Sequence, residues 1–391
     1  MALLILMTFL LGSIQNLKWK GKIETKEGIN TIKNPIDPLY GEIHLEIKED
    51  LSIGNDVDEN YMFYLAWYIT VDRTGNIYIG DWGAKHIQVY NKEGKYLRTI
   101  GRGGQGPGEF GSLDGVFVND LNGEIYVPDS FSIEIFSSNG NYQRTIPLQT
   151  YNRSYCIGPG GFIIGETNKY EFKGNDKGEI SKILASLRLI NSTNGTTTPI
   201  ASFPDQFSKH IEGRVLKFSH GYEDRFHMSA IDPKTFVYGF SSDYVLHIID
   251  SSGKLLFKIR KEGKLLPISS KEKDIIREKY SSFSVKNLNN IPFPKHKPYF
   301  GNILTCDDLI FVMHFKSPQD QTTIYSMDVF NIQGYYLYQC FLPVNPRVIK
   351  NGFIYLIETS DETGKTQIKR YKINNWDQIS ERTISQKDIP R

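Results

Sequence analysis

The stretch at residues 72–100, DRTGNIYIGDWGAKHIQVYNKEGKYLRTI, recurs in altered form at residues 120–146 as DLNGEIYVPDSFSIEIFSSNGNYQRTI. Both copies read Asp-x-x-Gly-x-Ile-Tyr, then an aspartate (Asp81 or Asp129), an alternating run, a glycine turn and Arg-Thr-Ile. Such short alternating runs bounded by turn residues predict a four-stranded antiparallel meander. Fainter copies follow at residues 160–203, 234–259 and 308–343, and from residue 351.

A single meander of this kind leaves both of its faces uncovered. Packing several of them radially buries the faces and protects the edge strands, which is the β-propeller arrangement. A repeat of roughly 40 to 50 residues is typical of one blade. The six copies therefore predict an all-β protein, a six-bladed β-propeller of four-stranded antiparallel blades that forms a single domain over residues 17–391. The 23 Tyr, 23 Phe and 34 Gly agree, because rings suit pleated sheets and glycine suits tight turns.

Two segments fall outside the repeat. An insertion at about residues 260–300 contains the capping-box pair Ser269 and Glu272, which predicts a short helix near residues 269–283. This insertion is either a specialised functional element or a packing lid on the outer rim. The segment at residues 17–41 shows strand alternation without the blade pattern. Because a propeller usually closes with a blade built from both chain ends, we expect this segment to complete or brace the last blade.

The repeat, together with the run GRGGQGPGEF at residues 101–110, resembles an NHL-type repeat. More narrowly, residues 19–146 are similar to secreted bacterial six-bladed β-propeller proteins whose roles are mostly unassigned. The segment before the first blade, WKGKI and then KNPIDPLYG, resembles what precedes the first blade in that group. The resemblance implies the fold and leaves the activity open.

The run at residues 101–110 also matches the G-x-G-x-x-G pattern of dinucleotide-binding loops. That pattern requires a helix directly after the glycines, whose N-terminus holds the pyrophosphate. Here a proline and a glycine follow, and the chain turns into the next strand, so we expect no nucleotide site. We predict instead a blade junction with positive φ at the glycines, a turn at the proline and Phe110 inserted between sheets. The predicted turn residues are Gly101, Gly103, Gly106 and Pro107.

A ligand-docking face follows from strand direction. Because successive strands alternate, the loop between the second and third strands of a blade lies on the same face as the loop between blades. Trp82 and His86 have no counterpart in the second copy, which makes them better site candidates than repeated residues. Asp81 and Asp129 are repeated, so we expect their carboxylates to bond turn N–H groups. The candidate ligand-binding residues on this face are Trp82, Lys85, His86, Arg102, Gln105 and Glu109.

These features favour a non-catalytic binding propeller without a cofactor, whose partner is a protein, peptide or glycan. The alternative is a metal-dependent hydrolase or lyase, since related-looking propellers include lactonases that gather ligands around the central axis. Under that alternative Ca or Zn is the expected metal. The available side chains are His86, His220, His227, His247 and Glu166. Their spacing selects no metal, so we assign no catalytic residue and no metal ligand.

The first 16 residues suggest export. The apolar run from Ala2 to Leu11 is too short to span a bilayer but matches the hydrophobic part of a secretory signal. The other interpretations are a buried first strand or a misplaced start codon. We expect a periplasmic or extracellular protein, released or held at the membrane by an uncleaved segment, with no other membrane span. A net charge of +2 gives no reason to expect nucleic acid as partner.

The three cysteines lack metal-ligand spacing, so we expect small buried apolar side chains. They are Cys156, Cys306 and Cys340. Nothing in the sequence calls for an oligomer, and we expect a monomer.

Overall fold

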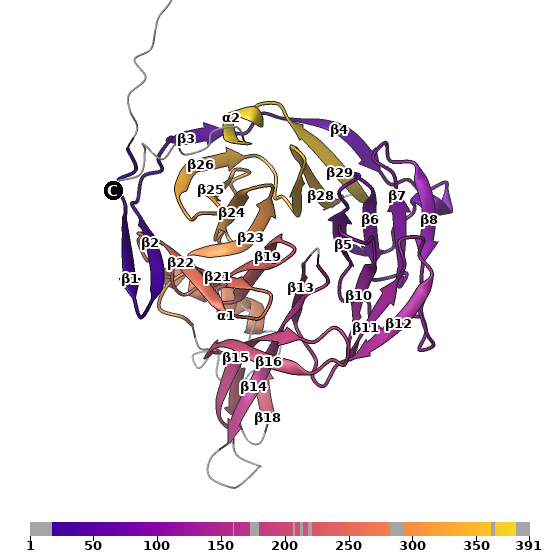
Figure 1. Ribbon diagram of the computed structural model, residues 1–391, viewed down its shortest axis with the longest axis horizontal. Coiled ribbons are helices and arrows are strands. Elements are labelled where there is room, and N and C mark those ends of the chain that lie inside the picture. Colours follow the sequence, from indigo (N-terminus) through magenta and orange to yellow (C-terminus); the bar gives the residue numbers. More distant parts are fainter. Residues whose placement is uncertain are drawn as a thin grey trace, which may run out of the picture.

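The computed structural model describes residues 18–158, 160–172, 180–205, 208–211, 214–217, 221–281, 293–360 and 364–380. The predicted signal segment at residues 1–16 lies outside these ranges. Six sheets, each built on four antiparallel strands, stand around a central axis, so the predicted six-bladed propeller is confirmed (Figure 1).

The first three blades follow one another along the chain, each sheet running from its innermost to its outermost strand. Blade 1 contains β5 (Ala66–Val71), β6 (Ile77–Asp81), β7 (His86–Tyr90) and β8 (Tyr96–Ile100). Blade 2 contains β9 (Phe117–Val118), β10 (Ile125–Asp129), β11 (Ser132–Phe136) and β12 (Tyr142–Pro147). Blade 3 contains β13 (Ser154–Ile157), β14 (Ile163–Phe172), β15 (Ile180–Ile190) and β16 (Thr197–Pro204).

The remaining blades use strands from both ends of the chain. Blade 4 contains β19 (Phe226–Asp232), β20 (Thr235–Phe240), β21 (Val245–Asp250) and β22 (Leu255–Lys261). Blade 5 contains β23 (Phe300–Cys306), β24 (Leu309–His314), β25 (Tyr325–Asn331) and β26 (Tyr336–Leu342). Blade 6 contains β27 (Val348–Lys350), β28 (Phe353–Thr359), β29 (Thr366–Ile373) and, as its outermost strand, β4 (Ile47–Ile53).

The N-terminal strands run along the outside of three blades, as the indigo ribbon shows (Figure 1). The hairpin of β1 (Lys22–Lys26) and β2 (Ile29–Asn34) adds to blade 4, where β2 pairs in parallel with β22. Then β3 (Glu42–His44) pairs in parallel with β26 of blade 5. The expectation that residues 17–41 lie on the last blade is therefore wrong. They brace blade 4, and β4 satisfies the open edge of β29.

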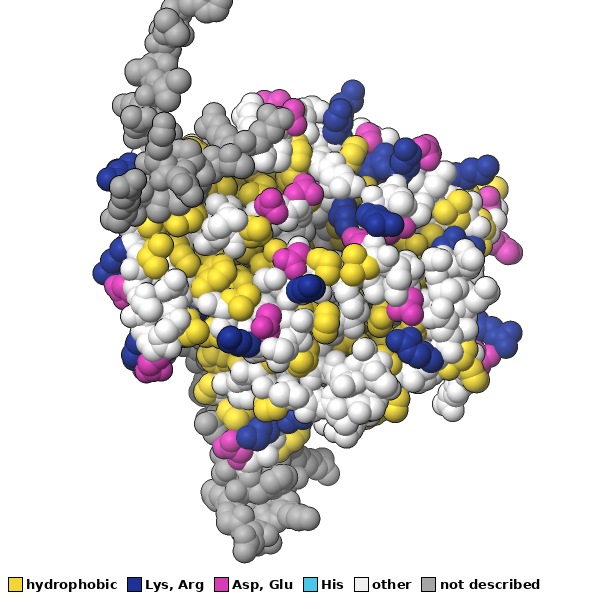
Figure 2. Space-filling model, viewed as in Figure 1, with side chains coloured by type: hydrophobic (Ala, Val, Ile, Leu, Met, Phe, Trp, Pro, Cys, Tyr) yellow, Lys and Arg dark blue, Asp and Glu magenta, His cyan; other side chains and the backbone are white. Residues whose placement is uncertain are grey.

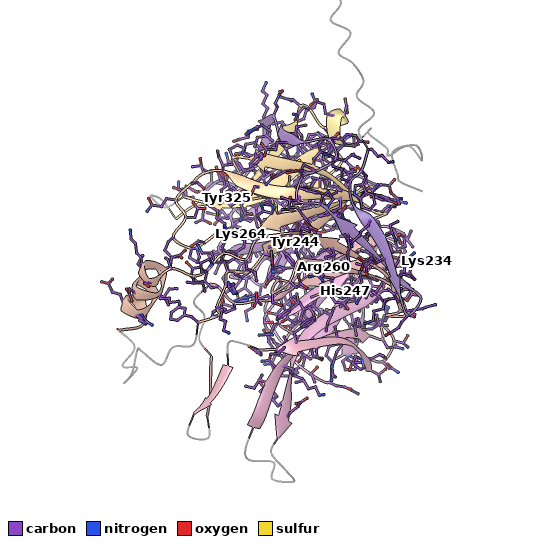
Figure 3. All side chains as sticks on the ribbon, turned by 90° about the vertical axis from the view of Figure 1, so that its left-hand side faces the viewer. Lys234, Tyr244, His247, Arg260, Lys264 and Tyr325 are labelled. Carbon is purple, nitrogen blue, oxygen red and sulfur yellow. The ribbon has the colours of Figure 1, made fainter. Side chains whose placement is uncertain are left out.

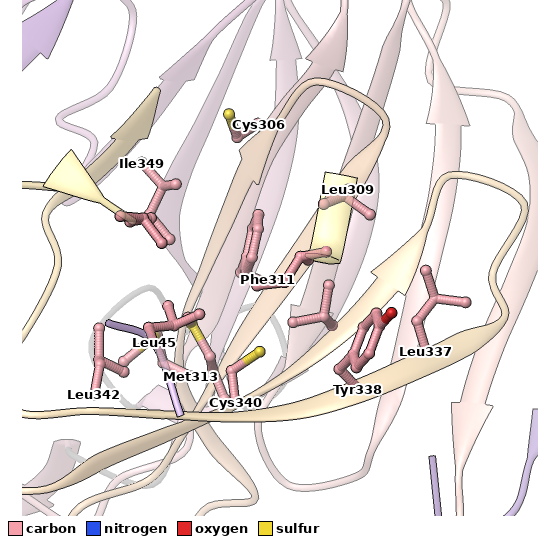
Figure 4. Packing of buried hydrophobic residues seen from close by; sticks show 14 of the residues in the cluster. Leu45, Cys306, Leu309, Phe311, Met313, Leu337, Tyr338, Cys340, Leu342 and Ile349 are labelled. Atoms are coloured by element: carbon pink, nitrogen blue, oxygen red, sulfur yellow. The ribbon is translucent and has the colours of Figure 1, made fainter. Parts of the chain in front are cut away.

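Apolar clusters between neighbouring sheets hold the ring together. Each blade presents one face to the next, and the cluster between blades 6 and 1 closes the circle. The cluster between blades 5 and 6 also includes Trp19 and Leu45 from the N-terminal segment. Figure 4 shows Leu45 packed beside Met313 and Cys340 of blade 5. All three cysteines are buried free thiols, which confirms the prediction for them. Burial raises the pKa of Cys156 to about 12, consistent with a packing role.

The blade junction at residues 101–110 behaves largely as predicted. Phe110 is fully buried and meets Phe136 of blade 2 edge to face at 5.7 Å. Gly101 has φ 71°, and a Cβ there would lie 2.2 Å from the Phe110 ring. Positive φ is not found at Gly103 or Gly106, so that part of the expectation is wrong. Neighbouring glycines take those backbone conformations instead: φ is 74° at Gly108.

All long insertions leave the propeller on one side, which we call the upper face. It carries the loops after the second and fourth strand of each blade, the hairpin β17 (Ser208–Ile211)–β18 (Arg214–Lys217), and helix α1 (Ser270–Ser281). Figure 3 shows α1 on the same side as Tyr244 and Lys264, and Lys234 on the opposite side. That opposite side, the lower face, bears scattered charges of both signs (Figure 2).

Helix α1 confirms the predicted helical insertion, within two residues at its C-terminal end. The Ser269 hydroxyl and backbone N–H both donate to Glu272 Oε2, at 2.8 and 2.9 Å, so the capping box forms. The other helices are short, namely η1 (Glu59–Tyr61) and α2 (Asp377–Ser380). Within the described ranges, no helix has the length and apolar character to cross a bilayer.

Candidate functional site

Exposed aromatic rings gather on the upper face of blades 1 to 3. Trp82 follows β6 and stacks on Trp67, with ring centroids 4.9 Å apart and planes at 19°. On the neighbouring blade, Phe131 lies 6.2 Å from Tyr151. Tyr64, beside the Trp82 turn, is 79% exposed, and Trp67, Phe131 and Tyr151 are 51%, 60% and 48% exposed. Trp82 itself is half-buried under this stack. We call Tyr64, Trp67, Trp82, Phe131 and Tyr151 the aromatic surface.

The repeated aspartates sit beneath these rings and bond to backbone. Asp81 accepts from the N–H groups of Tyr64 and Leu65 at 2.7 and 2.9 Å. Asp129 accepts from those of Gly111 and Ser112 at 2.7 and 2.6 Å. Each carboxylate thereby ties the loop entering its blade to the turn after the second strand, and its oxygens are used within the scaffold.

Several other predicted site residues are engaged within the loops themselves. Arg102 makes a two-pronged ion pair with Glu109, with Nε and Nη2 at 2.8 and 2.7 Å from Oε1. Glu109 Oε2 also accepts from the Gly106 N–H, so this pair holds the junction loop in shape. The Lys85 ammonium donates to the Gly111 carbonyl. Gln105 is exposed at the loop tip.

The described histidines of the metal-dependent alternative do not gather into a metal site. Burial lowers the pKa of His86, and its Nε2 finds no hydrogen-bond partner among the described residues. Burial also lowers the pKa of His227 and of His247 to about 4. His220 lies outside the described residues. Glu166 lies inside β14 rather than at a strand end, and pairs with a neighbouring arginine. The described part of the chain holds no group of three or more His, Cys, Asp or Glu arranged for a metal.

A second region lies on the same face between blades 4 and 5. Here a pocket of about 380 Å³ opens beneath the base of the α1 insertion. Tyr244 and Lys261 of blade 4 form one side, and His314 and Ser326 of blade 5 form the other. Figure 3 shows Tyr244, Lys264 and Tyr325 on the α1 side of the molecule. Residues of the 260–300 insertion, Gly263, Lys264, Leu266, Lys297, Pro298 and Tyr299, supply the rim.

A fully buried carboxylate, Asp328, bonds to three side chains that line this pocket, and we call this buried group the pocket floor. Its Oδ1 accepts from the Tyr336 hydroxyl at 2.5 Å, and its Oδ2 accepts from the Tyr244 hydroxyl. The same Oδ2 lies 2.9 Å from Lys261 Nζ and 3.0 Å from His314 Nε2. Burial alone would raise the Asp328 pKa. The hydrogen bonds and positive charges around the carboxylate outweigh this effect of burial, and together they lower the Asp328 pKa to about 2.

The insertion is fastened over the pocket by a second polar group. Glu272, in the first turn of α1, accepts from Lys297 Nζ at 2.7 Å. It also accepts from the Tyr222 hydroxyl and from Ser317 Oγ, both at 3.0 Å. Because Ser317 belongs to the β24–β25 loop, the insertion is tied to blade 5 and encloses the pocket wall.

Sequence reasoning missed the pocket. The available signal was Asp328 itself, an aspartate inside the apolar run MDVF of a predicted buried strand. Ionised side chains are almost never fully buried unless they are paired, so such a position calls for a partner elsewhere in the fold. The partners Lys261 and Tyr244 come from another blade, and no local pattern links them to it.

A family described as a 6-bladed beta-propeller, DUF5128, matches residues 69–290, more than half of the chain. The chain belongs to this family. A comparison with curated protein sequences gives no match.

Solved structures support the fold of this DUF5128 member and nothing finer. A DUF4221 family member from Bacteroides vulgatus has a TM-score of 0.53 at 15% identity, covering 85% of this chain and 99% of that one. A putative exported protein from Bacteroides fragilis has a TM-score of 0.51 at 11% identity, covering 88% and 100%. Virginiamycin B lyase from Staphylococcus aureus reaches 0.40 at 10% identity, covering 84% and 99%, which is too low to carry an argument.

Proposed function

We propose that this propeller is a binding protein that docks a polypeptide partner on the aromatic surface, a role that needs no catalytic step at that surface. The observation that carries the proposal is the exposed Trp67 ring stacked on half-buried Trp82 beside exposed Tyr64, with exposed Phe131 and Tyr151 on the next blade. Exposed apolar rings gathered on one face of a folded protein mark interaction sites, and Trp and Tyr are enriched among the residues that dominate binding energy at protein interfaces.

The scaffold beneath these rings suits a binding role. The Asp81 and Asp129 carboxylates fix the turns through backbone bonds, so the rings stand on rigid supports. Rigid aromatic side chains lose little conformational entropy on binding. The Arg102–Glu109 pair preorganises the adjoining loop and leaves the guanidinium 81% exposed at its edge.

A phage-displayed library of random peptides, panned on the full chain, tests this proposal. We expect peptides to be enriched on the native protein and lost on the double variant Trp67→Ala/Trp82→Ala. The matched control is Leu121→Ala, which removes an exposed apolar side chain from the lower face and should leave enrichment unchanged. Peptide binding that survives the double substitution would overturn the proposal. So would a protein that binds no peptide but binds glycans on a glycan array.

We also propose that the chain is exported. The apolar run at residues 2–11 supports this, and one similar structure is named a putative exported protein. Expression in a Gram-negative host followed by fractionation and N-terminal sequencing tests it. The native chain should reach the periplasm, whereas Ile5→Arg, which places a charge in the apolar run, should hold it in the cytoplasm. Equal cytoplasmic retention of both would contradict the proposal.

A further inference from the structure

The pocket between blades 4 and 5 contains a hydroxyl, an imidazole and a carboxylate in a chain of hydrogen bonds. Ser326 Oγ lies 2.9 Å from His314 Nδ1, and His314 Nε2 lies 3.0 Å from Asp328 Oδ2. Ser326 and Asp328 alternate on β25 and therefore share one face of the strand. His314 ends the adjacent strand β24. Register between the two strands places all three side chains on the same side of blade 5.

The bonding partners determine where the protons sit. Asp328 is an ionised carboxylate that only accepts hydrogen bonds, so His314 Nε2 must carry a hydrogen and donate it. In the neutral imidazole Nδ1 is then the acceptor, and the Ser326 hydroxyl must donate to it. The imidazole is thus oriented to take the proton of Ser326, with a fixed negative charge behind it.

The three groups also differ in solvent exposure, which decreases from the serine and histidine at the pocket to the buried aspartate. Asp328 is fully buried, the His314 side chain is 25% exposed, and Ser326 is half-buried and lines the pocket. A reacting group can therefore reach Ser326 Oγ from solvent while the carboxylate stays dry. Lys261 Nζ contacts the same Oδ2 as His314, at the carboxylate end of this chain of bonds, and lines the same pocket.

We propose that Ser326 is the nucleophile of an esterase site for carboxylic esters with a small acyl group, with His314 as its general base and Asp328 as the positioning carboxylate. This proposal does not depend on the proposed binding role of the aromatic surface. The order Ser–His–Asp matches the general logic of activated serine nucleophiles, and a pocket of this volume is in the range used for small ligands.

The chemistry balances with water as the only co-reactant. Ser326 Oγ bonds to the carbonyl carbon while its proton passes to His314 Nδ1. The C–O bond to the alcohol then breaks, and the leaving oxygen takes that proton, which leaves an acyl-serine. Water, deprotonated by the same Nδ1, attacks the acyl group and releases the carboxylic acid. Ser326 recovers its proton, and Asp328 stays ionised throughout and stabilises the imidazolium.

The first test uses the full chain with a fluorophosphonate probe and with p-nitrophenyl acetate. We expect the probe to label Ser326, located by peptide mass spectrometry, and Ser326→Ala to lose labelling and at least roughly 10³-fold in kcat/KM. The matched control is Ser202→Ala on β16, whose hydroxyl bonds another serine at 3.1 Å; it should change neither. A native protein that is not labelled, or hydrolysis that survives Ser326→Ala, overturns the proposal.

A second measurement distinguishes a reactive site from a folding defect. Ser326→Cys should place a thiol beside His314, whose imidazole promotes the thiolate. Its alkylation by iodoacetamide at pH 7 should be at least tenfold faster than that of the thiol introduced by Ser202→Cys. The native cysteines are buried and serve as an internal background. Equal alkylation rates for the two introduced thiols would show that His314 does not activate this position, and the proposal fails.

Discussion

On blades 1 to 3 the exposed rings stand on short turns of a regular repeat, whereas between blades 4 and 5 the polar side chains come from separate segments of the chain. Trp82 is positioned by a turn in which the Asp81 carboxylate accepts from the Ala84 N–H, three residues along the chain. Asp328 instead meets Tyr244 and Lys261, which lie 84 and 67 residues away. The side chains of the aromatic surface lie on the outside of the packed blades, whereas the pocket floor is part of the packed interior.

This difference has a consequence for mutation. Side chains on the aromatic surface can be substituted without disturbing a buried core. Substitutions there should therefore weaken binding while leaving the free energy of unfolding nearly unchanged. Asp328 contacts cations and phenols that are themselves buried, so any change at the pocket floor should affect stability as well as chemistry.

The largest effect is expected from Asp328→Asn. The amide keeps the shape but leaves Lys261 Nζ, 10% exposed, without its counter-charge. Removing one partner of a buried ion pair costs roughly 3–5 kcal/mol. Urea unfolding should show this loss, and Asp243→Asn, at an exposed carboxylate on the same face, should leave the midpoint unchanged. A small effect of Asp328→Asn would mean that the pocket floor contributes as little to the stability of the fold as the aromatic surface does.

The next effect is a pH dependence. Because the folded-state pKa of Asp328 is about 2, below the ordinary 3.8, ionised Asp328 stabilises the fold above about pH 4. This contribution, about 2 kcal/mol, should be lost as pH falls from about 4 to about 2. Unfolding titrations of the native chain and of Asp328→Asn should converge over that range. Parallel curves would show that Asp328 titrates normally and that its partners do not hold its charge.

A smaller effect is expected at the cap of α1. Ser269→Ala removes the hydroxyl that bonds Glu272, at a cost of about 1 kcal/mol. Since Glu272 also fastens the insertion to blade 5, amide exchange should quicken in α1 and around the pocket. Exchange on the turns of the aromatic surface should not change and serves as the control. Faster exchange on both regions would show that they are coupled.

The smallest effect on stability is expected from Trp82→Ala. Trp82 contributes a stacked pair at the surface, worth about 1 kcal/mol or less. The control is Trp19→Ala, because Trp19 is 3% exposed and donates to Asn34 Oδ1 at 3.0 Å. That substitution should cost roughly 3–5 kcal/mol by unfolding. Comparable losses for the two tryptophans would make the aromatic surface a structural element and remove the basis for its binding role.

The N-terminal segment shows where sequence reasoning reached its limit within the fold. Its alternation correctly indicated strands, but not their place. Asn34 ends β2 on blade 4 and accepts from the Tyr336 N–H at 2.9 Å while donating to the Gly334 carbonyl at 2.8 Å. These contacts span about 300 residues of chain and join blades 4 and 5. The local sequence of a parallel strand at an outer edge does not indicate which strand it pairs with.

The sequence by itself determined the blades, their number, the helix capped at Ser269 and the junction anchored by Phe110. Each of these depends on alternation, turn residues or caps within a few positions of one another, which local physical rules capture. It also pointed to Trp82, because a ring that breaks a repeat is visible in the repeat. Only the tertiary structure decided the stacking of Trp67 on Trp82, the course of the N-terminal strands and the meeting of Ser326, His314 and Asp328 with Lys261. Those contacts depend on how sheets twist and pack against one another around the axis, and a buried charge such as Asp328 finds its partners across that packing, not along the chain.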